Sequence, residues 1–85
     1  MITGQELKEI ELRVNQAQHG PWKAYIENRD HESGSSFIMT GNEDGGSRGE
    51  DIYLLGATTA DYDFIAHARQ DIPRLIQEIR QLMNK

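Results

Sequence analysis

The stretch 57-ATTADYDFIAHARQDIPRLIQEIRQLMNK-85 carries apolar residues at the three- and four-residue spacing of an amphipathic helix. Thr58 or Thr59 can cap its start, because acidic side chains follow and suit the positive end of the helix dipole. Pro73 disfavours α geometry at Ile72, so the pattern predicts two helices with a break near Asp71, which would cap the second. The apolar positions of that second helix are Ile72, Leu75, Ile76, Ile79, Leu82 and Met83.

Another amphipathic helix is predicted at the other end of the chain, over residues 3–18. Thr3 and Glu6 stand in the T-x-x-E order of a capping box. Gly20 and Pro21 end the helix and begin an extended segment. The apolar stripe of this helix consists of Leu7, Ile10, Val14 and Ala17.

Three segments between the helices have the composition of strands, namely 21-PWKAYIEN-28, 35-SSFIMTG-41 and 51-DIYLLG-56. Polar, glycine-containing loops join them, which is typical of an antiparallel meander. The sequence therefore predicts one α+β domain over residues 1–85. An N-terminal helix, a three-stranded antiparallel β-meander and two C-terminal helices follow in that order, with the helices packed on one sheet face.

Alternation along the predicted strands assigns each side chain to one face of the sheet. The face toward the helices would carry Trp22, Ala24, Ile26, Phe37, Met39, Ile52 and Leu54. The outer face would carry Lys23, Tyr25, Ser36, Ile38, Thr40, Tyr53 and Leu55. Tyrosine and aliphatic side chains on an outer face indicate that something covers it. A subunit interface, the terminal helices or an intersubunit ligand pocket would do so, and an ordinary exposed face is the remaining alternative.

Composition narrows the classes of function. The chain has 85 residues, a net charge of −5 and no cysteine. This acidic balance opposes non-specific nucleic-acid binding, the apolar runs are too short to cross a membrane, and the N-terminus lacks the pattern of a signal peptide. A domain of this size buries roughly 60–65% of its unfolded surface, so we expect oligomerisation to add stability. The absence of cysteine fits a cytoplasmic protein.

The segment 29-RDHE-32 offers a candidate binding loop. Asp30, His31 and Glu32 are adjacent and therefore lack the spacing of a metal site. One interpretation is a solvated loop. The other is that Arg29 and His31 hold an anionic or polar ligand.

A second histidine lies in the predicted C-terminal helices. Asp63, His67 and Asp71 follow at i, i+4 and i+8, which places them in one row. A surface charge cluster has this pattern, and so does a general base held by a carboxylate. No serine or cysteine nucleophile accompanies the row.

Three further residues are candidates because of their chemistry. Arg69 can form a two-pronged contact with a carboxylate or phosphate. Arg48 lies in the glycine-rich loop 41–51, which can turn backbone N–H groups toward an anion but matches no phosphate-binding loop, so a flexible hairpin connection is the alternative. Trp22 is either a core anchor or a stacking surface for a base.

Hydrogen-bonding groups beside aromatic rings suit a polar small molecule such as a nucleotide. The candidate ligand-binding residues are Trp22, Tyr25, Arg29, His31, Ser36, Thr40, Arg48, Tyr53, His67 and Arg69.

Two segments resemble small proteins of phages, prophages and assorted bacteria. One is 20-GPW-22 after an amphipathic helix, and the other runs from Ala60 to Leu82. The second follows the pattern A-D-x-x-F-I-A-x-A-R-x-D-(I/V)-P-x-L-(L/I)-x-E-(I/V) and is similar to Ead-like early phage proteins. Most of this motif describes a helix core and its caps, so it implies a family and no chemistry.

Phage proteins of comparable size include oligomers that sequester nucleotide immune signals such as isomers of cyclic ADP-ribose. By analogy of class alone, we expect a non-enzymatic homo-oligomer, dimeric or larger, that holds an ADP-ribose-derived or cyclic nucleotide at a subunit interface. We expect no metal, cofactor, nucleic acid or membrane partner, and a place in the host cytoplasm. The alternatives are a protein–protein interaction module that docks on a host factor through its apolar sheet face, and a small hydrolase that uses Asp63, His67 and Asp71.

Overall fold

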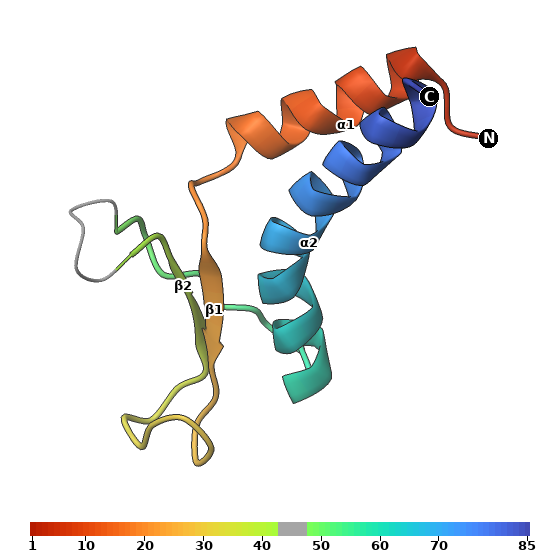
Figure 1. Cartoon of the computed structure of the whole chain (residues 1–85). Coiled ribbons are helices and arrows are strands. Elements are labelled where there is room, and N and C mark those ends of the chain that lie inside the picture. The colour runs from red at the N-terminus through yellow and green to blue at the C-terminus, as the bar shows by residue number, and fades with distance from the viewer. Residues whose placement is uncertain (43–47) are drawn as a thin grey trace.

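A computed structural model describes residues 1–42 and 48–85 of the chain. Its elements are α1 (Gly4–Gln16), β1 (Trp22–Tyr25), β2 (Phe37–Thr40) and α2 (Thr59–Met83). The two strands form an antiparallel sheet against the first half of α2, and α1 lies along the second half (Figure 1). The predicted α+β class is confirmed.

The start of α1 is fixed by the predicted capping box. The Thr3 hydroxyl accepts a hydrogen bond from the Glu6 N–H at 3.1 Å, and the Thr3 N–H donates to the Glu6 carboxylate at 2.9 Å. These bonds satisfy two of the backbone groups that a helix start leaves free and lower the pKa of Glu6. Leu7 is the one residue of α1 that is fully buried.

The C-terminal helix begins at the cap that the sequence offered. The Thr58 hydroxyl accepts from the Asp61 N–H at 3.1 Å, and the Asp61 carboxylate accepts from the Thr58 N–H at 3.0 Å. Thr58 is therefore the N-cap, and Thr59 is the first helical residue.

The predicted break near Asp71 is wrong, because α2 continues through Pro73 as one helix of 25 residues. Proline removes a single backbone donor from a helix interior. Packing holds the helix on both sides of that position, with Tyr62 and Ala66 buried before it and Ile76 buried after it. Asp71 consequently lies in the helix interior and caps nothing.

The register of the sheet corrects the predicted faces of β2. Trp22 pairs with Thr40 and Ala24 pairs with Ile38, so these paired side chains share one face. Ile38 and Thr40 are both fully buried on the side of α2, and Phe37 and Met39 lie on the outer face. The prediction had these two faces of β2 exchanged.

The physical reason is that 37-FIMT-40 has apolar side chains at three successive positions. Its pattern therefore favours neither face, and pairing with β1 decides between them. The predicted inward positions of Trp22, Ala24 and Ile26 are confirmed, because these residues are buried in the core or packed against it.

The predicted third strand is not present among the described residues. Segment 51–56 lies beside β2 but joins it through one bridge, in which Ile38 and Ile52 exchange backbone hydrogen bonds of 2.8 and 2.9 Å. Ile52 and Leu54 pack against the core on the predicted face. The meander is therefore not confirmed beyond this bridge.

A side chain of α2 occupies the place of the next pair in this ladder. The Tyr62 hydroxyl accepts from the Leu54 N–H at 3.1 Å and lies 3.1 and 3.3 Å from the carbonyl oxygens of Leu54 and Ser36. These are the backbone groups that would meet if the strand continued. One buried phenol thus replaces the ladder and ties the segment to α2.

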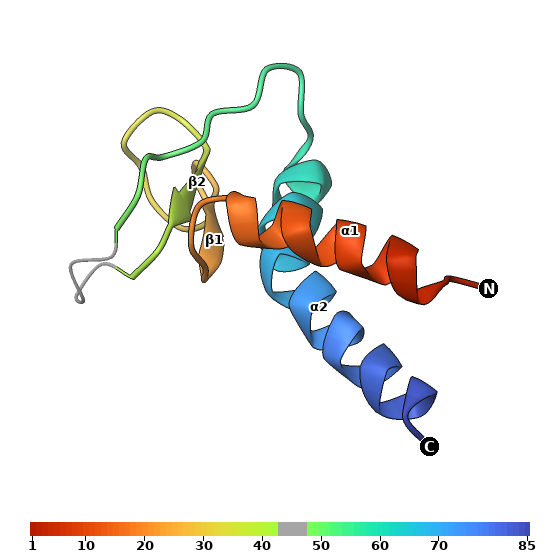
Figure 2. The same ribbon diagram turned by 90° about the horizontal axis from the view of Figure 1, so that it is seen from above.

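The core is small and lies at one end of an elongated molecule. It consists of Ala24, Ile26, Ile38, Tyr62 and Ala66, between the sheet and the first half of α2. The molecule measures 48 × 29 × 18 Å, and the pair of helices extends away from the sheet in both views (Figures 1 and 2). Neither helix of the described chain combines the length and apolar character needed to cross a membrane.

Side chains bind the free edge of β1 at its first residue and just beyond its last. The alternation of the ladder turns the backbone groups of Trp22, Ala24 and Ile26 away from β2. The Gln70 amide accepts from the Trp22 N–H at 2.7 Å and donates to the Trp22 carbonyl at 3.0 Å, while the Asp30 carboxylate accepts from the Ile26 N–H at 2.8 Å. Gln70 thus makes the two backbone hydrogen bonds that a neighbouring strand would make with Trp22, and it fixes the position of that residue.

Candidate functional site

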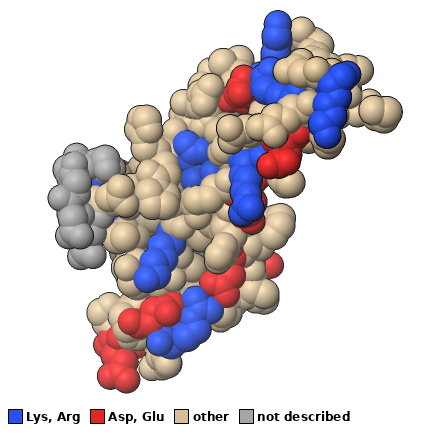
Figure 3. All heavy atoms as spheres, in the orientation of Figure 1, with Lys and Arg blue, Asp and Glu red and all other residues tan. Residues whose placement is uncertain are grey.

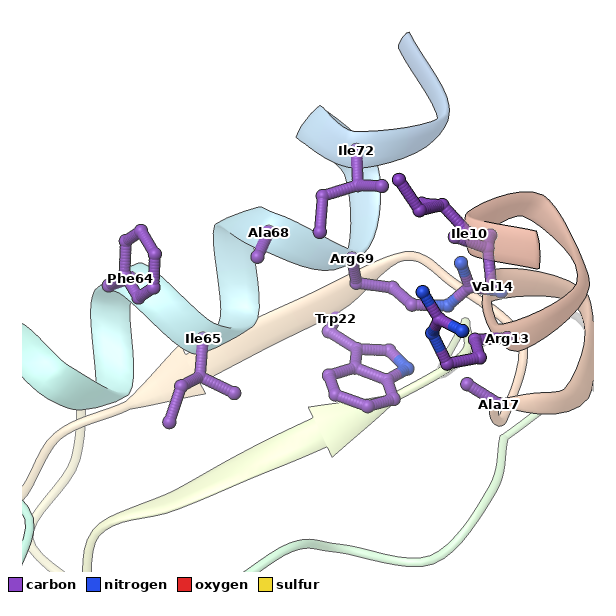
Figure 4. Close-up of a pocket in the computed structure, with 10 residues that line it drawn as sticks. All are labelled: Ile10, Arg13, Val14, Ala17, Trp22, Phe64, Ile65, Ala68, Arg69 and Ile72. Atoms are coloured by element: carbon purple, nitrogen blue, oxygen red, sulfur yellow. The ribbon is translucent and has the colours of Figure 1, made fainter. Parts of the chain in front are cut away.

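An apolar pocket of about 340 Å³ lies between α1 and α2 beside the start of β1 (Figure 4). Eight of its ten lining residues are apolar, and the other two are arginines. From α1 come Ile10, Arg13 and Val14, and Ala17 directly follows that helix. The others are Trp22 of β1 and Phe64, Ile65, Ala68, Arg69 and Ile72 of α2.

Trp22 forms the wall of the pocket nearest the sheet. Its indole N–H lies 3.2 Å from the carbonyl oxygens of both Gln18 and His19, and Gln70 holds its backbone. The polar atom of the ring is therefore already engaged, and the ring contributes an apolar surface to the pocket.

Two guanidinium groups extend into the space beside this indole (Figure 4). The Arg69 Nε donates to the Gln18 carbonyl at 2.8 Å, which directs the terminal nitrogens onward. Arg13 reaches the pocket from the last turn of α1. Two positive side chains beside an apolar wall favour an anion there, because the wall screens their field less than water does.

Only Trp22 and Arg69 of the predicted ligand residues meet in this pocket. The sequence prediction missed Arg13, because an arginine in the last turn of a helix is usually explained by its favourable interaction with the negative end of the helix dipole. It also missed Gln18, whose carboxamide oxygen accepts from the Glu50 N–H at 2.9 Å and lies 3.2 Å from the Thr40 hydroxyl oxygen. No sequence signal marks such a glutamine.

Three other predicted residues gather on the outer face of the sheet, around Phe37. The rings of Tyr25 and Phe37 stack at 5.5 Å between centroids, and His31 and Tyr53 lie 5.4 and 5.9 Å from Phe37. The His31 Nδ1 accepts from a backbone N–H of the loop, and its Nε2 is buried without a hydrogen-bond partner in the described part of the chain. Lys23 covers the Tyr25 ring at 4.9 Å. We call the four rings the outer aromatic cluster.

Two carboxylates bind Arg29, which was predicted as a ligand-binding residue. Its guanidinium donates to both oxygens of Asp63, at 2.8 and 3.0 Å, and to Asp30. This contact holds the pKa of Asp63 below its ordinary value and raises that of Arg29. The pair fastens the loop after β1 to the first turns of α2.

The predicted row of Asp63, His67 and Asp71 is accordingly divided. Asp63 is bound to Arg29, while His67 is exposed. All three residues line a second hollow of about 470 Å³. This hollow follows the edge of β1 from Trp22 to Ala24. Asp71 lies outside it.

The remaining predicted residues serve the framework of the sheet. The Ser36 hydroxyl accepts from the Glu27 N–H at 3.1 Å, and the buried Thr40 hydroxyl donates to the Glu50 carbonyl at 2.8 Å. Arg48 pairs with Asp51 at 2.6 Å. The other part of the glycine-rich loop prediction, residues 43–47, lies outside the described residues.

Charge is mixed on the face of the molecule that Figure 3 shows. Basic and acidic side chains lie close together over much of the face in Figure 3. Such a surface does not present one large field of a single sign, so charge selection has to occur locally, as between Arg13 and Arg69.

Comparisons of the chain with protein families, with curated proteins and with solved structures find no match.

Proposed function

We propose that the chain is a non-enzymatic binding protein whose ligand is a small anion with a flat aromatic ring, of nucleotide type. The observation that carries the proposal is the pocket between α1 and α2, in which one tryptophan ring and two guanidinium groups line a mainly apolar wall. An apolar ring gains free energy on that wall, and an anionic group gains it at the arginines.

The size of the pocket supports a small molecule. Its volume of about 340 Å³ falls at the lower end of the range for ligand pockets, roughly 300–1,000 Å³. The wall accommodates one ring system, and the ribose and phosphate groups of a nucleotide extend toward Arg13 at the rim. The analogy of class with small phage proteins that sequester nucleotides is what favours a nucleotide immune signal over other aromatic anions.

In this proposal Arg13 and Arg69 bind the anion, in place of Arg29 and Arg48, which the sequence suggested. Arg29 and Arg48 are each neutralised by aspartate, at 2.8 and 2.6 Å. Recruiting either arginine to a ligand would leave its aspartate without that partner. Arg13 and Arg69 line the pocket itself and carry the role at lower cost.

Trp22 is the only tryptophan, so its fluorescence reports directly on the pocket. We propose titrations with AMP, ADP-ribose and a cyclic nucleotide, with adenosine and inorganic phosphate as partial ligands. The expected result is saturable quenching by an anionic nucleotide and at least a tenfold weaker response to adenosine, because adenosine lacks the charge.

The matched variants are Arg13→Gln and Arg48→Gln. Arg13→Gln should weaken the response about tenfold, and Arg48→Gln should leave it unchanged, because Arg48 pairs with Asp51 away from the pocket. Equal affinity of both variants and wild type for the same nucleotide would remove this assignment.

The outer aromatic cluster supports a second candidate function, the docking of a protein partner on the sheet. Tyr53 is exposed beside Phe37, and exposed tyrosines are frequent anchors of interfaces. Tyr53→Glu should then abolish capture of the partner, whereas Arg13→Gln should not. The reverse pattern would favour the pocket.

A further inference from the structure

Residues 65–82 of α2 follow a seven-residue apolar repeat. Its first positions, called a, are Ile65, Ile72 and Ile79, and its fourth positions, called d, are Ala68, Leu75 and Leu82. A β-branched residue at a with leucine at d is the pattern by which two helices pack along a common seam. We call these six residues the α2 seam.

The first helix covers only one side of this seam. Ile76, which follows the d position, is buried where α1 lies along α2. Exposure is greater on the d side of the seam than on the a side: Ile72 at an a position is 39% exposed, whereas Leu75 and Leu82 at d positions are 58% and 63% exposed. The second half of α2 therefore has a partner on one flank and an open row of leucines on the other.

The whole chain exposes more surface than its size requires. Its accessible area is 6329 Å², whereas a compact monomer of 9.7 kDa exposes about 5,100 Å². The radius of gyration is 15.2 Å, against about 12 Å for a compact domain of this length. Part of this excess lies on the second half of α2, where Leu75 and Leu82 are exposed.

We propose that the open side of the α2 seam binds a second copy of this chain. The two copies would pack their α2 helices together around Leu75 and Leu82, with the two α1 helices on the flanks, as a four-helix bundle. Because the same patch serves both copies, the interface closes on itself as a dimer. The dimer is held by the helices, and the sheets lie at its periphery.

The proposed dimer does not depend on the ligand. The start of the seam, up to Ile72, lines the apolar pocket, while Leu75 and Leu82 lie beyond it. A second copy on the leucines would therefore leave the pocket beside the interface. A wild-type dimer that binds no nucleotide would refute the proposed function alone. A wild-type monomer that binds a nucleotide would refute the dimer alone.

Sedimentation velocity over a range of concentrations tests the proposal. Wild type should sediment as a dimer of about 19 kDa at about 100 µM, twice the mass of 9.7 kDa. The double variant Leu75→Glu/Leu82→Glu should raise the dimer dissociation constant at least about a hundredfold, because it places charge in the seam. Leu12→Glu is the matched control, since Leu12 is also 58% exposed but lies on α1.

Circular dichroism shows whether each variant retains its helices, which distinguishes loss of the dimer from loss of the fold. As a second measurement, Leu82→Cys gives a chain with a single thiol, because the sequence has no cysteine. Cysteine-directed cross-linking of Leu82→Cys and of Leu75→Cys should trap a dimer for at least one of them, and Leu12→Cys should not. A monomeric wild type, or a dimer that resists the double variant and yields only to Tyr53→Glu, would overturn the proposal.

Discussion

The two halves of the molecule differ in how completely they are packed. The sheet and the first half of α2 enclose Ile38 and Tyr62, and the Tyr62 hydroxyl is hydrogen-bonded to backbone groups there. Among the described residues, the second half of α2 has only α1 beside it and leaves Leu75 and Leu82 exposed. The first half is therefore stabilised by its own contacts, whereas the second half has a free apolar side that suits an additional partner.

The largest expected effect concerns the centre of the packed half. Ile38→Ala should lower the free energy of unfolding by about 2–5 kcal/mol, because Ile38 is fully buried and the change leaves a cavity. Urea unfolding followed by circular dichroism measures it. Leu12→Ala, at an exposed site on the open half, is the control and should change stability by less than about 0.5 kcal/mol. Similar losses at both sites would contradict the contrast between the halves.

The next effect concerns the phenol that replaces the third strand. Tyr62→Phe should cost about 1–3 kcal/mol, because it leaves the Leu54 N–H without its acceptor at a partly buried site. Hydrogen exchange at the Leu54 amide should accelerate as well. Tyr53→Phe removes an exposed hydroxyl and is the control. An unchanged exchange rate at Leu54 would show that Tyr62 does not hold this segment.

The two capping boxes allow the halves to be compared with one chemistry. Thr3→Ala and Thr58→Ala should each destabilise their own helix by about 1 kcal/mol. We expect Thr58→Ala to lower global stability, because α2 supports the core. Thr3→Ala should mainly increase hydrogen exchange within the first turn of α1. Equal global losses would show that α1 is as firmly coupled to the core as α2.

The smallest effect is a pH dependence in the packed half. The Arg29 contact lowers the pKa of Asp63, so this pair stabilises the fold above the ordinary aspartate pKa of about 4. That stabilisation is lost as pH falls through the lowered pKa of the folded state. The melting temperature of wild type should therefore fall below about pH 4 more steeply than that of Asp63→Asn. Parallel curves would exclude the pair as a contributor.

Much of the fold follows from local patterns in the sequence. Thr3 and Thr58 each begin a helix because a hydroxyl and a carboxylate three residues later can satisfy the free backbone donors. The alternation of Trp22, Ala24 and Ile26 places them on the core side for the same local reason. The outer aromatic cluster was foreseen only in part, since Phe37 was assigned to the wrong face.

The candidate site was less accessible to sequence reasoning. It depends on Arg13 and Arg69, which are 56 positions apart and line one pocket because α2 runs back along α1. The pairing of Arg29 with the distant Asp63 also could not be read from the sequence. Contacts of this kind depend on chain path, which no local pattern encodes.

Local sequence patterns were enough to predict the start of α1, the choice of Thr58 or Thr59 as the cap of α2, the α+β class and the apolar rows of both helices, because hydrogen bonding within a turn and periodicity act over a few residues. The face of β2, the continuity of α2 through Pro73 and the role of Tyr62 depend on tertiary contacts. Each of these depends on which distant group fills a given space. The physical reason is that packing and long-range pairing can outweigh a local preference of a few kcal/mol.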